Sequence, residues 1–151
     1  MVRETRIVIV DTYAIIADLT GQVSSIAAKV LDDIRVGRIK GILHYLIVYE
    51  LAYHWRRGRL PFRNEKELLE FIDTYFDIKP LDPVIAIEAS RLKIVGDELL
   101  RNSGNPKLKR RKLSISDATT IVLATKLKTP IVTGDVNLSY VARSLGVKVI
   151  W

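Results

Sequence analysis

The chain has 151 residues and a mass of 17.1 kDa, which suits one hydrophobic core and leaves no room for two. Its composition, 48% hydrophobic and 27% charged, is that of a globular protein and excludes a disordered chain. No apolar run approaches the ~18 residues of a membrane span, and the opening MVRETRIVIVD is too short for a secretory signal. The lack of cysteine excludes disulfides and thiolate metal ligands. We therefore expect one soluble, cytoplasmic domain over residues 1–151.

The charge balance favours an anionic partner. Twenty-four Lys and Arg against 17 Asp and Glu give a formal net charge of +7 and a pI near 9.7. Such an excess favours nucleic acid above other partners. Five of the positive charges form a cluster within residues 107–112, namely Lys107, Lys109, Arg110, Arg111 and Lys112. This cluster is either an RNA-binding patch or a loop whose charges serve only solubility.

The hydrophobic pattern of the first part of the chain predicts strands and helices in alternation. Residues 6–10 (RIVIV) are a short β-branched run, typical of a strand buried on both faces. Residues 12–38 have a helical pattern with a break near Gly21. A second strand is expected over residues 39–44, and it passes directly into a helix over residues 45–55.

The remainder of the chain continues the same alternation. Asn64 can cap a helix over residues 64–75, and Pro83 can open another that runs to about Arg101. Residues 102–112 contain Asn, Ser, Gly, Pro and the basic cluster, so we expect an exposed loop there. The apolar stripe of the first of these helices consists of Leu68, Leu69, Ile72 and Phe76. The other expected elements are strands over 78–81, 130–133 and 147–150 and helices over 115–128 and 138–145.

Strands that are connected through helices pair in parallel, which predicts a three-layer α/β/α sandwich with a parallel sheet of four to five strands. In such folds the ligand site lies beyond the carboxyl ends of the strands. Asp11 follows the first strand and Asp135 follows the fourth. Glu50 lies in the helix after the second strand, and Asp117 lies in the first turn of the helix that leads into the fourth. We expect these four carboxylates to converge at one edge of the sheet.

Converging carboxylates repel one another unless a cation lies among them or protons are taken up. Oxygen ligands without cysteine or a pair of histidines suit Mg²⁺ or Mn²⁺ rather than zinc. Beside a basic surface, such a site suggests phosphodiester chemistry, in which the metal polarises the phosphoryl oxygen and activates water.

Each acid also has a purely structural interpretation. Asp11 can cap the first helix, and Asp117, three residues after Ser114, can belong to a capping box or interact with the helix dipole. Asp135 can be part of a Thr-Gly-Asp turn. Glu50 lies in an almost wholly apolar helix, where a buried ion pair with a distant base is the structural alternative.

Five segments carry a family resemblance through their order and spacing: IVIVDTYAII, IVYEL, IKPLDPVIAIEASRL, LSISDATTIVLATKL and IVTGDVNLSYVARSLGVKVI. In these segments the chain resembles the PIN-domain family, and within it the VapC-type endoribonuclease toxins, over nearly its whole length. The resemblance implies a parallel sheet of order 3-2-1-4-5, a homodimer, and a neutralising antitoxin protein whose segment occupies the cleft.

The resemblance also implies roles for single residues. It assigns Asp11, Glu50, Asp117 and Asp135 to the catalytic metal site. Thr133 is expected to form a hydrogen bond within the site, and Thr12 is expected to orient the neighbouring carboxylate. The family often has a further acid two residues after the last one, where this chain has Asn137. The amide carbonyl or a bridging water could serve as ligand there, so the departure concerns the affinity or number of the metal ions.

Other aromatic and basic residues have weaker signals. His44 and His54 are ten residues apart, which does not suit a helical zinc site. The aromatic residues Tyr45, Tyr49, Tyr53 and Trp55 are expected in the core or at a dimer face, with stacking on bases as the alternative. Arg56, Arg57 and Arg59 form a second basic patch that, with the cluster at residues 107–112, can hold the RNA backbone.

The leading hypothesis is a Mg²⁺- or Mn²⁺-dependent endoribonuclease, the toxin of a toxin–antitoxin pair. The alternative is a catalytically silent PIN-like module that binds RNA and is regulated by a partner protein. A third possibility, phosphotransfer with Asp11 as acceptor, is disfavoured because Tyr13 stands where a second Asp would be needed.

Overall fold

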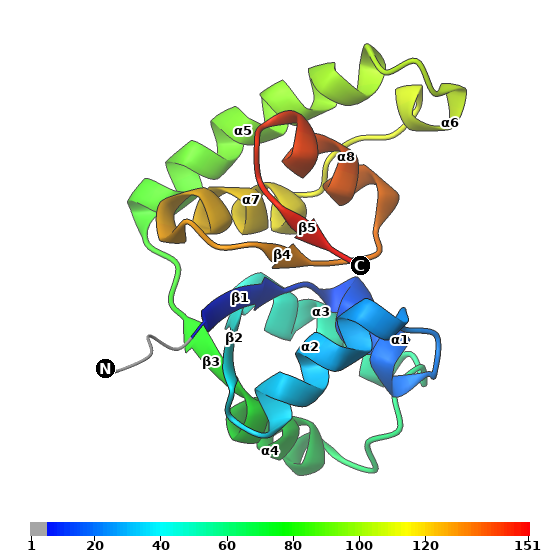
Figure 1. Ribbon diagram of the computed structural model, residues 1–151, viewed down its shortest axis with the longest axis vertical. Helices are drawn as coiled ribbons and strands as arrows, with labels where there is room; N and C mark the ends of the chain where they lie inside the picture. The colour runs from blue at the N-terminus through cyan, green and yellow to red at the C-terminus, as the bar shows by residue number, and fades with distance from the viewer. Residues whose placement is uncertain (1–5) are drawn as a thin grey trace.

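The computed structural model describes residues 6–151, so part of the opening segment considered above as a secretory signal lies outside the described residues. Its centre is a five-stranded parallel sheet in the order β3-β2-β1-β4-β5 with helices on both faces (Figure 1). The expected sandwich and strand order are thereby confirmed. The strands are β1 (Arg6–Val10), β2 (Ile39–His44), β3 (Phe76–Lys79), β4 (Ile131–Val132) and β5 (Val149–Ile150).

The helices begin where a polar side chain accepts a hydrogen bond from the first turn. Asn64, Asp82 and Ser114 are such N-caps, each with its side-chain oxygen on the N–H three residues later. Within residues 6–151 no helix is long and apolar enough to cross a membrane. The helices are α1 (Thr12–Leu19), α2 (Ser25–Arg35), α3 (Tyr45–Arg56), α4 (Glu65–Tyr75), α5 (Pro83–Arg101), α6 (Pro106–Lys109), α7 (Ile115–Leu127) and α8 (Val136–Ser144).

Several expected boundaries are wrong, and the last two strands are shorter than expected, β4 at Ile131–Val132 and β5 at Val149–Ile150. Phe76 is the first residue of β3 rather than part of the α4 stripe, because it has an extended backbone and pairs with Gly41 of β2. Leu69, expected in the same stripe, is 55% exposed. The segment expected to be a loop contains α6, whose Leu108 is buried in the core. α8 begins two residues before the expected start, because Asp135 caps it.

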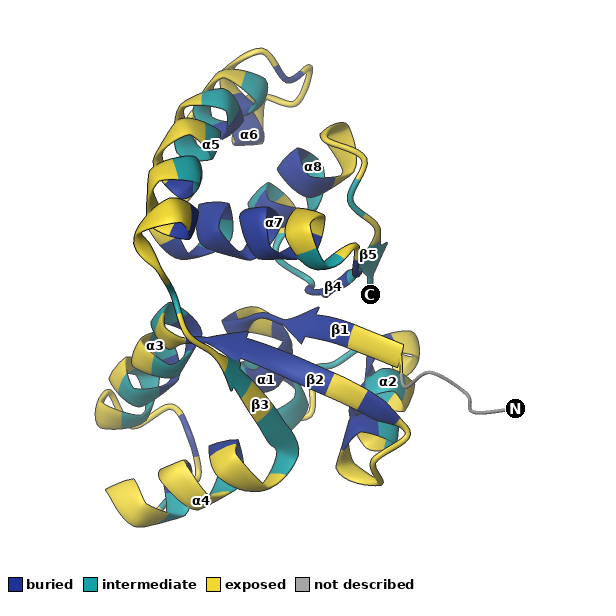
Figure 2. Ribbon diagram, turned by 90° about the vertical axis from the view of Figure 1, so that its left-hand side faces the viewer, coloured by how far each residue is buried: buried dark blue, intermediate teal, exposed yellow. Residues whose placement is uncertain are grey.

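Each face of the sheet has its own hydrophobic cluster. Val8 and Val10 of β1 point to the cluster shared with α1, α2, α3 and α4, whereas Ile9 points to the cluster shared with α5, α6, α7 and α8. This alternation is the period of a strand buried on both sides. Figure 2 shows the carboxyl-terminal part of β1 and most of β2 as the buried centre between the two helical layers. The carboxyl end of β1 is therefore held rigidly from above and below.

His44 connects the two layers at the end of β2. Its side chain is fully buried, and its Nδ1 accepts a hydrogen bond of 3.2 Å from the Leu46 N–H. The neutral ring therefore carries its proton on Nε2, which donates to Thr120 Oγ of α7 at 2.9 Å. Burial lowers the pKa of His44 to about 4, and only an interaction with the Ser116 backbone opposes this shift.

We predict that protonation of His44 destabilises the fold in mild acid. In the unfolded chain the histidine has a pKa near 6.5, whereas in the folded protein its pKa is about 4. This contribution to stability is full above pH 6.5 and falls as the pH drops toward 4, by roughly 3 kcal/mol in total. Urea unfolding at pH 7 and pH 4.5 measures it. The His44→Gln variant keeps an N–H for Thr120 but cannot titrate, so it should lose roughly 2–3 kcal/mol less over this interval. Equal losses in both proteins would contradict the assignment.

Candidate active site

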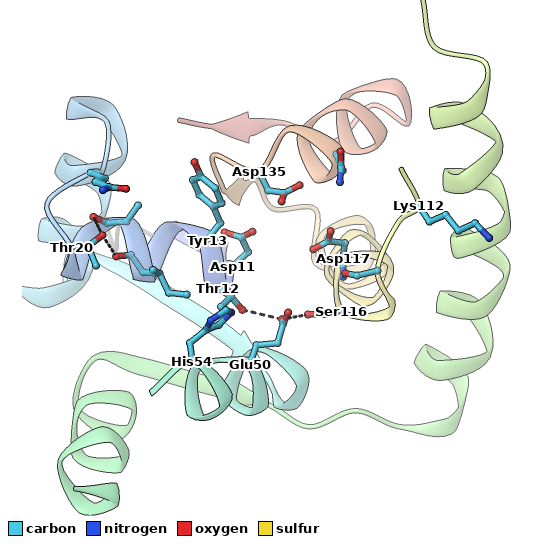
Figure 3. Close-up of a pocket in the computed structure, with 15 residues that line it drawn as sticks. Asp11, Thr12, Tyr13, Thr20, Glu50, His54, Lys112, Ser116, Asp117 and Asp135 are labelled. Carbon is cyan, nitrogen blue, oxygen red and sulfur yellow. Dashed lines mark hydrogen bonds between the residues drawn. The ribbon is translucent and has the colours of Figure 1, made fainter. Parts of the chain in front are cut away.

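The four predicted acids line one cavity of about 440 Å³ at the carboxyl end of the sheet. Asp11 follows β1, Glu50 lies on α3, Asp117 lies in the first turn of α7, and Asp135 precedes α8. Figure 3 shows their side chains directed into a common space from four separate segments. The structure thus brings together residues that are up to 124 positions apart in the sequence.

Asp11 is held by two hydrogen bonds and is 5% exposed. Its Oδ1 caps α1 by accepting the Ala14 N–H at 3.0 Å, and its Oδ2 accepts the Thr133 hydroxyl at 2.7 Å. The Thr133 hydroxyl in turn accepts the Asp135 N–H at 3.0 Å. Capping and membership of the acidic cavity are therefore two roles of the same carboxylate, each oxygen serving one of them.

Glu50 is fixed by hydroxyl groups rather than by a base. Its Oε1 accepts hydrogen bonds from Thr12 at 3.0 Å and from Ser116 at 2.7 Å, drawn as dashed lines in Figure 3. It forms no ion pair within the described part of the chain. Thr12 thus orients Glu50 across the cavity, although the sequence analysis placed its hydroxyl on the adjacent Asp11.

The other two acids are held by the starts of their helices. The Ser114 side chain accepts the Asp117 N–H at 3.0 Å, as expected for the cap of α7. The Asp135 Oδ1 accepts the Leu138 N–H at 2.9 Å and so caps α8. These contacts fix the polypeptide on both sides of the cavity, and the Asp135 carboxylate cannot move away without breaking the cap of α8.

The crowding of carboxylates alters their protonation. Burial is the main cause that raises the pKa of Asp11 to about 7, and the negative charges of Asp135 and Glu50 add to it against two hydrogen bonds. Burial also raises the pKa of Asp117 to about 8, followed by the charges of Asp135, Asp11 and Glu50. Near neutral pH the cavity therefore holds protons, and a cation would relieve the same repulsion.

The donor set fits a hard divalent cation. Carboxylate oxygens dominate the cavity, and the buried Oδ1 of Asn137 has no hydrogen-bond partner among residues 6–151. An acceptor buried in this way requires a donor or a cation. In the described residues, however, no three His, Cys, Asp or Glu side chains are arranged to hold one ion between them. The arrangement suits Mg²⁺, which usually keeps several waters and binds through one or two carboxylates.

The basic residues lie mostly outside the cavity. Lys112 is the member of the 107–112 cluster that lines it, together with Ser114 and Ser116. Arg56 instead forms an ion pair with Glu65 at 3.1 Å and lies over the Trp55 ring. The remaining predicted RNA contacts are absent from the cavity wall and lie exposed at the surface, namely Arg57, Lys107, Lys109, Arg110 and Arg111.

Two aromatic residues of the cavity wall were not predicted as site residues. His54 lies one helical turn after Glu50, and its Nδ1 is 2.9 Å from an Arg59 nitrogen, the donor of this pair. Tyr13 lies two residues after Asp11 and is 47% exposed. Their short distance in sequence from the predicted acids Glu50 and Asp11 was the signal that could have identified them as residues of the site. The tyrosines Tyr45, Tyr49 and Tyr53 are each at least half exposed, which excludes them from the core of the monomer.

Solved structures with the same fold come from several proteins. PAE2754 from Pyrobaculum aerophilum is 19% identical, with a TM-score of 0.62 over 96% of this chain and 84% of that one. FitAB bound to the IR36 DNA fragment is 17% identical, with a TM-score of 0.60 over 94% of this chain and 92% of that one. VapBC2 from Rickettsia felis, bound to a DNA fragment from its promoter, is 12% identical, with a TM-score of 0.61 over 95% and 96%.

These identities are low, so the likeness shows the fold alone. No curated protein matches the sequence at a significant level. The family model for the PIN domain, in contrast, matches residues 8–144, which include all four acids. The chain therefore belongs to the PIN domain family.

Proposed function

We propose that the protein is a Mg²⁺- or Mn²⁺-dependent endoribonuclease. The observation that carries this proposal is the cavity itself, which Asp11, Glu50, Asp117 and Asp135 line together. PIN domains are generally nucleases, and the resemblance to VapC-type toxins favours RNA as the substrate. The net charge of +7 favours a polyanion as well.

The residues of the chain have separate tasks in this proposal. Asp11, Glu50, Asp117 and Asp135 would hold the cation, and the Asn137 amide oxygen would be a further acceptor beside it. When bound, the ion would supply Lewis-acid chemistry that polarises a phosphoryl oxygen and makes water a better nucleophile. Thr12, Thr133 and Ser116 keep the carboxylates in place through their hydrogen bonds.

The basic side chains act on the substrate. Lys112, at the wall of the acidic cavity, offsets the repulsion between the carboxylates and an incoming phosphate. The neighbouring residues Lys107, Lys109, Arg110 and Arg111 and the patch of Arg56 and Arg57 hold the flanking phosphates. Such contacts depend on salt and carry little sequence information.

We further propose that the protein is a toxin with an antitoxin partner and that it forms a homodimer. FitAB and VapBC2, whose folds it shares, are complexes of two components. An acidic cavity of this kind would accept a basic segment of an antitoxin. Exposed apolar side chains available for a dimer contact include Tyr45, Val84, Ile87 and Ile94.

A specific observation favours the second candidate, a catalytically silent RNA-binding module. Among the described residues no three Asp, Glu or His side chains are placed so that they could bind one ion together. This module would bind RNA in a salt-sensitive way without metal-dependent turnover. Cleavage and metal binding therefore discriminate between the two proposals.

We predict that cleavage depends on both the metal and Asp11. The purified protein is incubated with mixed-sequence single-stranded RNA, single-stranded DNA and duplex RNA, each with Mg²⁺, Mn²⁺ or EDTA. Single-stranded RNA should be cut with either metal and stay intact in EDTA. Asp11→Asn retains the cap of α1 but loses a negative charge, so its rate should fall on the order of 100-fold or more.

The matched control is Asp73→Asn, which makes the same chemical change on an exposed site of α4. It should cleave at the rate of the wild type. Undiminished cleavage by Asp11→Asn would overturn the site assignment, and intact RNA with both metals would favour the silent module.

We predict that Asp117→Asn stabilises the metal-free protein at alkaline pH. The pKa of Asp117 rises from 3.8 in the unfolded chain to about 8 in the fold, so folding becomes less favourable as the pH rises from about 4 to 8. At pH 8 in EDTA the variant should be more stable by roughly 2–4 kcal/mol, and at pH 4 this advantage should vanish. Urea unfolding measures both values.

Adding Mn²⁺ at pH 8 should narrow this difference in stability. The wild type should gain about 2.7 kcal/mol at an ion concentration 100 times the dissociation constant, while the variant gains less. Equal stabilisation of both proteins by Mn²⁺ would exclude Asp117 from the metal site.

A further inference from the structure

A second cavity, of about 580 Å³, lies next to the acidic one. It is lined by Thr133, Gly134 and Val136, while Asp135 and Asn137 of the same segment line the acidic cavity. From Gly134 to Asn137, successive residues therefore line the two spaces in turn. This segment forms a common wall of the two cavities.

Two aromatic rings cover the backbone between these cavities. Tyr13 lines the acidic cavity and Trp151 lines the second one, and their rings meet edge to face with centroids 5.5 Å apart. Both rings touch Gly134: a Cβ there would lie 2.5 Å from Trp151 Cε2 and 2.6 Å from Tyr13 Cε1. Position 134 thus requires glycine for space, and the rings are held rigidly against the main chain. Figure 3 shows the Tyr13 ring standing beside Asp11 and Asp135.

The second cavity has the chemistry of a nucleobase site. Trp151 and Tyr140 supply aromatic surface, Leu108 is apolar, and Ser139 has a hydroxyl group for the polar edge of a base. Arg143 is exposed at the wall and forms no ion pair with residues 6–151. Flat aromatic faces bind bases by stacking, and a free guanidinium group binds phosphate or stacks as well.

The basic cluster runs beside both cavities. Leu108 of α6 lines the second cavity, and Lys112, four residues later, lines the acidic one. One positively charged segment therefore accompanies a strand that passes from the first space to the second. A phosphodiester at the carboxylates and a base beside Trp151 are compatible with one continuous nucleic acid chain.

We propose that the second cavity is a nucleobase subsite, in which a base next to the phosphate at the acidic cavity stacks on Trp151. The bases of a duplex are already stacked on one another, so the subsite selects single-stranded RNA. The proposal rests on the proposed function only in taking RNA as the ligand, and it requires no cleavage. A peptide partner is the competing occupant, and it predicts that loss of a base has no effect.

The test measures RNA binding in EDTA, where metal-dependent cleavage cannot consume the ligand. A single-stranded oligonucleotide carries one abasic nucleotide, moved along the chain position by position. At the position that faces Trp151, the wild type should bind the abasic strand about 5- to 100-fold more weakly than the intact strand. Trp151→Leu should bind the intact strand equally weakly and show no further loss with the abasic one.

Two more variants separate the subsite from general effects. Arg143→Gln changes an exposed side chain, so it should fold normally, weaken binding and lower the salt dependence by about one ion. Tyr49→Leu removes an exposed aromatic ring of α3, the stacking face considered in the sequence analysis, and should bind like the wild type. If Tyr49→Leu weakens binding and Trp151→Leu does not, the subsite is excluded.

If the wild type binds every abasic strand as tightly as the intact strand, the proposal is overturned. This outcome requires no variant of the protein. That result is compatible with a nuclease that cuts RNA and holds only its phosphates. Position-dependent loss of affinity in a protein that never cleaves would support the subsite and reject the enzyme. The two proposals can therefore fail separately.

Discussion

The two hydrogen bonds of the buried Asp11 carboxylate hold the site together. One oxygen accepts from the first turn of α1 and the other from Thr133, at the end of the neighbouring strand. Thr133 also accepts the backbone N–H of Asp135, so the ends of β1 and β4 and the start of α8 form one hydrogen-bonded unit. Because the end of β1 packs against a hydrophobic cluster on each face of the sheet, this unit is attached to the buried centre of the fold.

That rigidity has an electrostatic cost. Three of the four carboxylates are held in place, because Asp11 and Asp135 cap helices and Glu50 accepts hydrogen bonds from two hydroxyl groups. Burial, with a further contribution from the neighbouring carboxylates, raises the pKa values of Asp11 and Asp117, and the buried amide oxygen of Asn137 adds an acceptor without a donor among residues 6–151. Protons can relieve this excess of negative groups near neutral pH, and a divalent cation can relieve it with greater effect.

The fold was predictable because its elements have strong local signals. The β-branched run at Arg6–Val10 and the proline at the start of Pro83–Arg101 gave the observed bounds. Phe76 was misplaced because pairing with Gly41, 35 residues away, overrides the helical pattern around it. The acids were found through their positions after strands and in the matching motifs. The hydrogen-bond partners of these acids were not predicted. The hydrogen bond from Ser116 to Glu50, for example, joins residues 66 positions apart, for which no local sequence pattern exists.

The connection from Thr133 to Asn137 explains how so small a domain combines two spaces. Asp135 and Asn137 line the acidic cavity, while Thr133, Gly134 and Val136 line the second. The missing side chain of Gly134 admits the Tyr13 and Trp151 rings, which in turn clamp the backbone that carries Asp135. The Trp151 ring therefore lies against the residue that precedes Asp135, so the wall between the two cavities and the position of one of the four acids depend on the same packing contact.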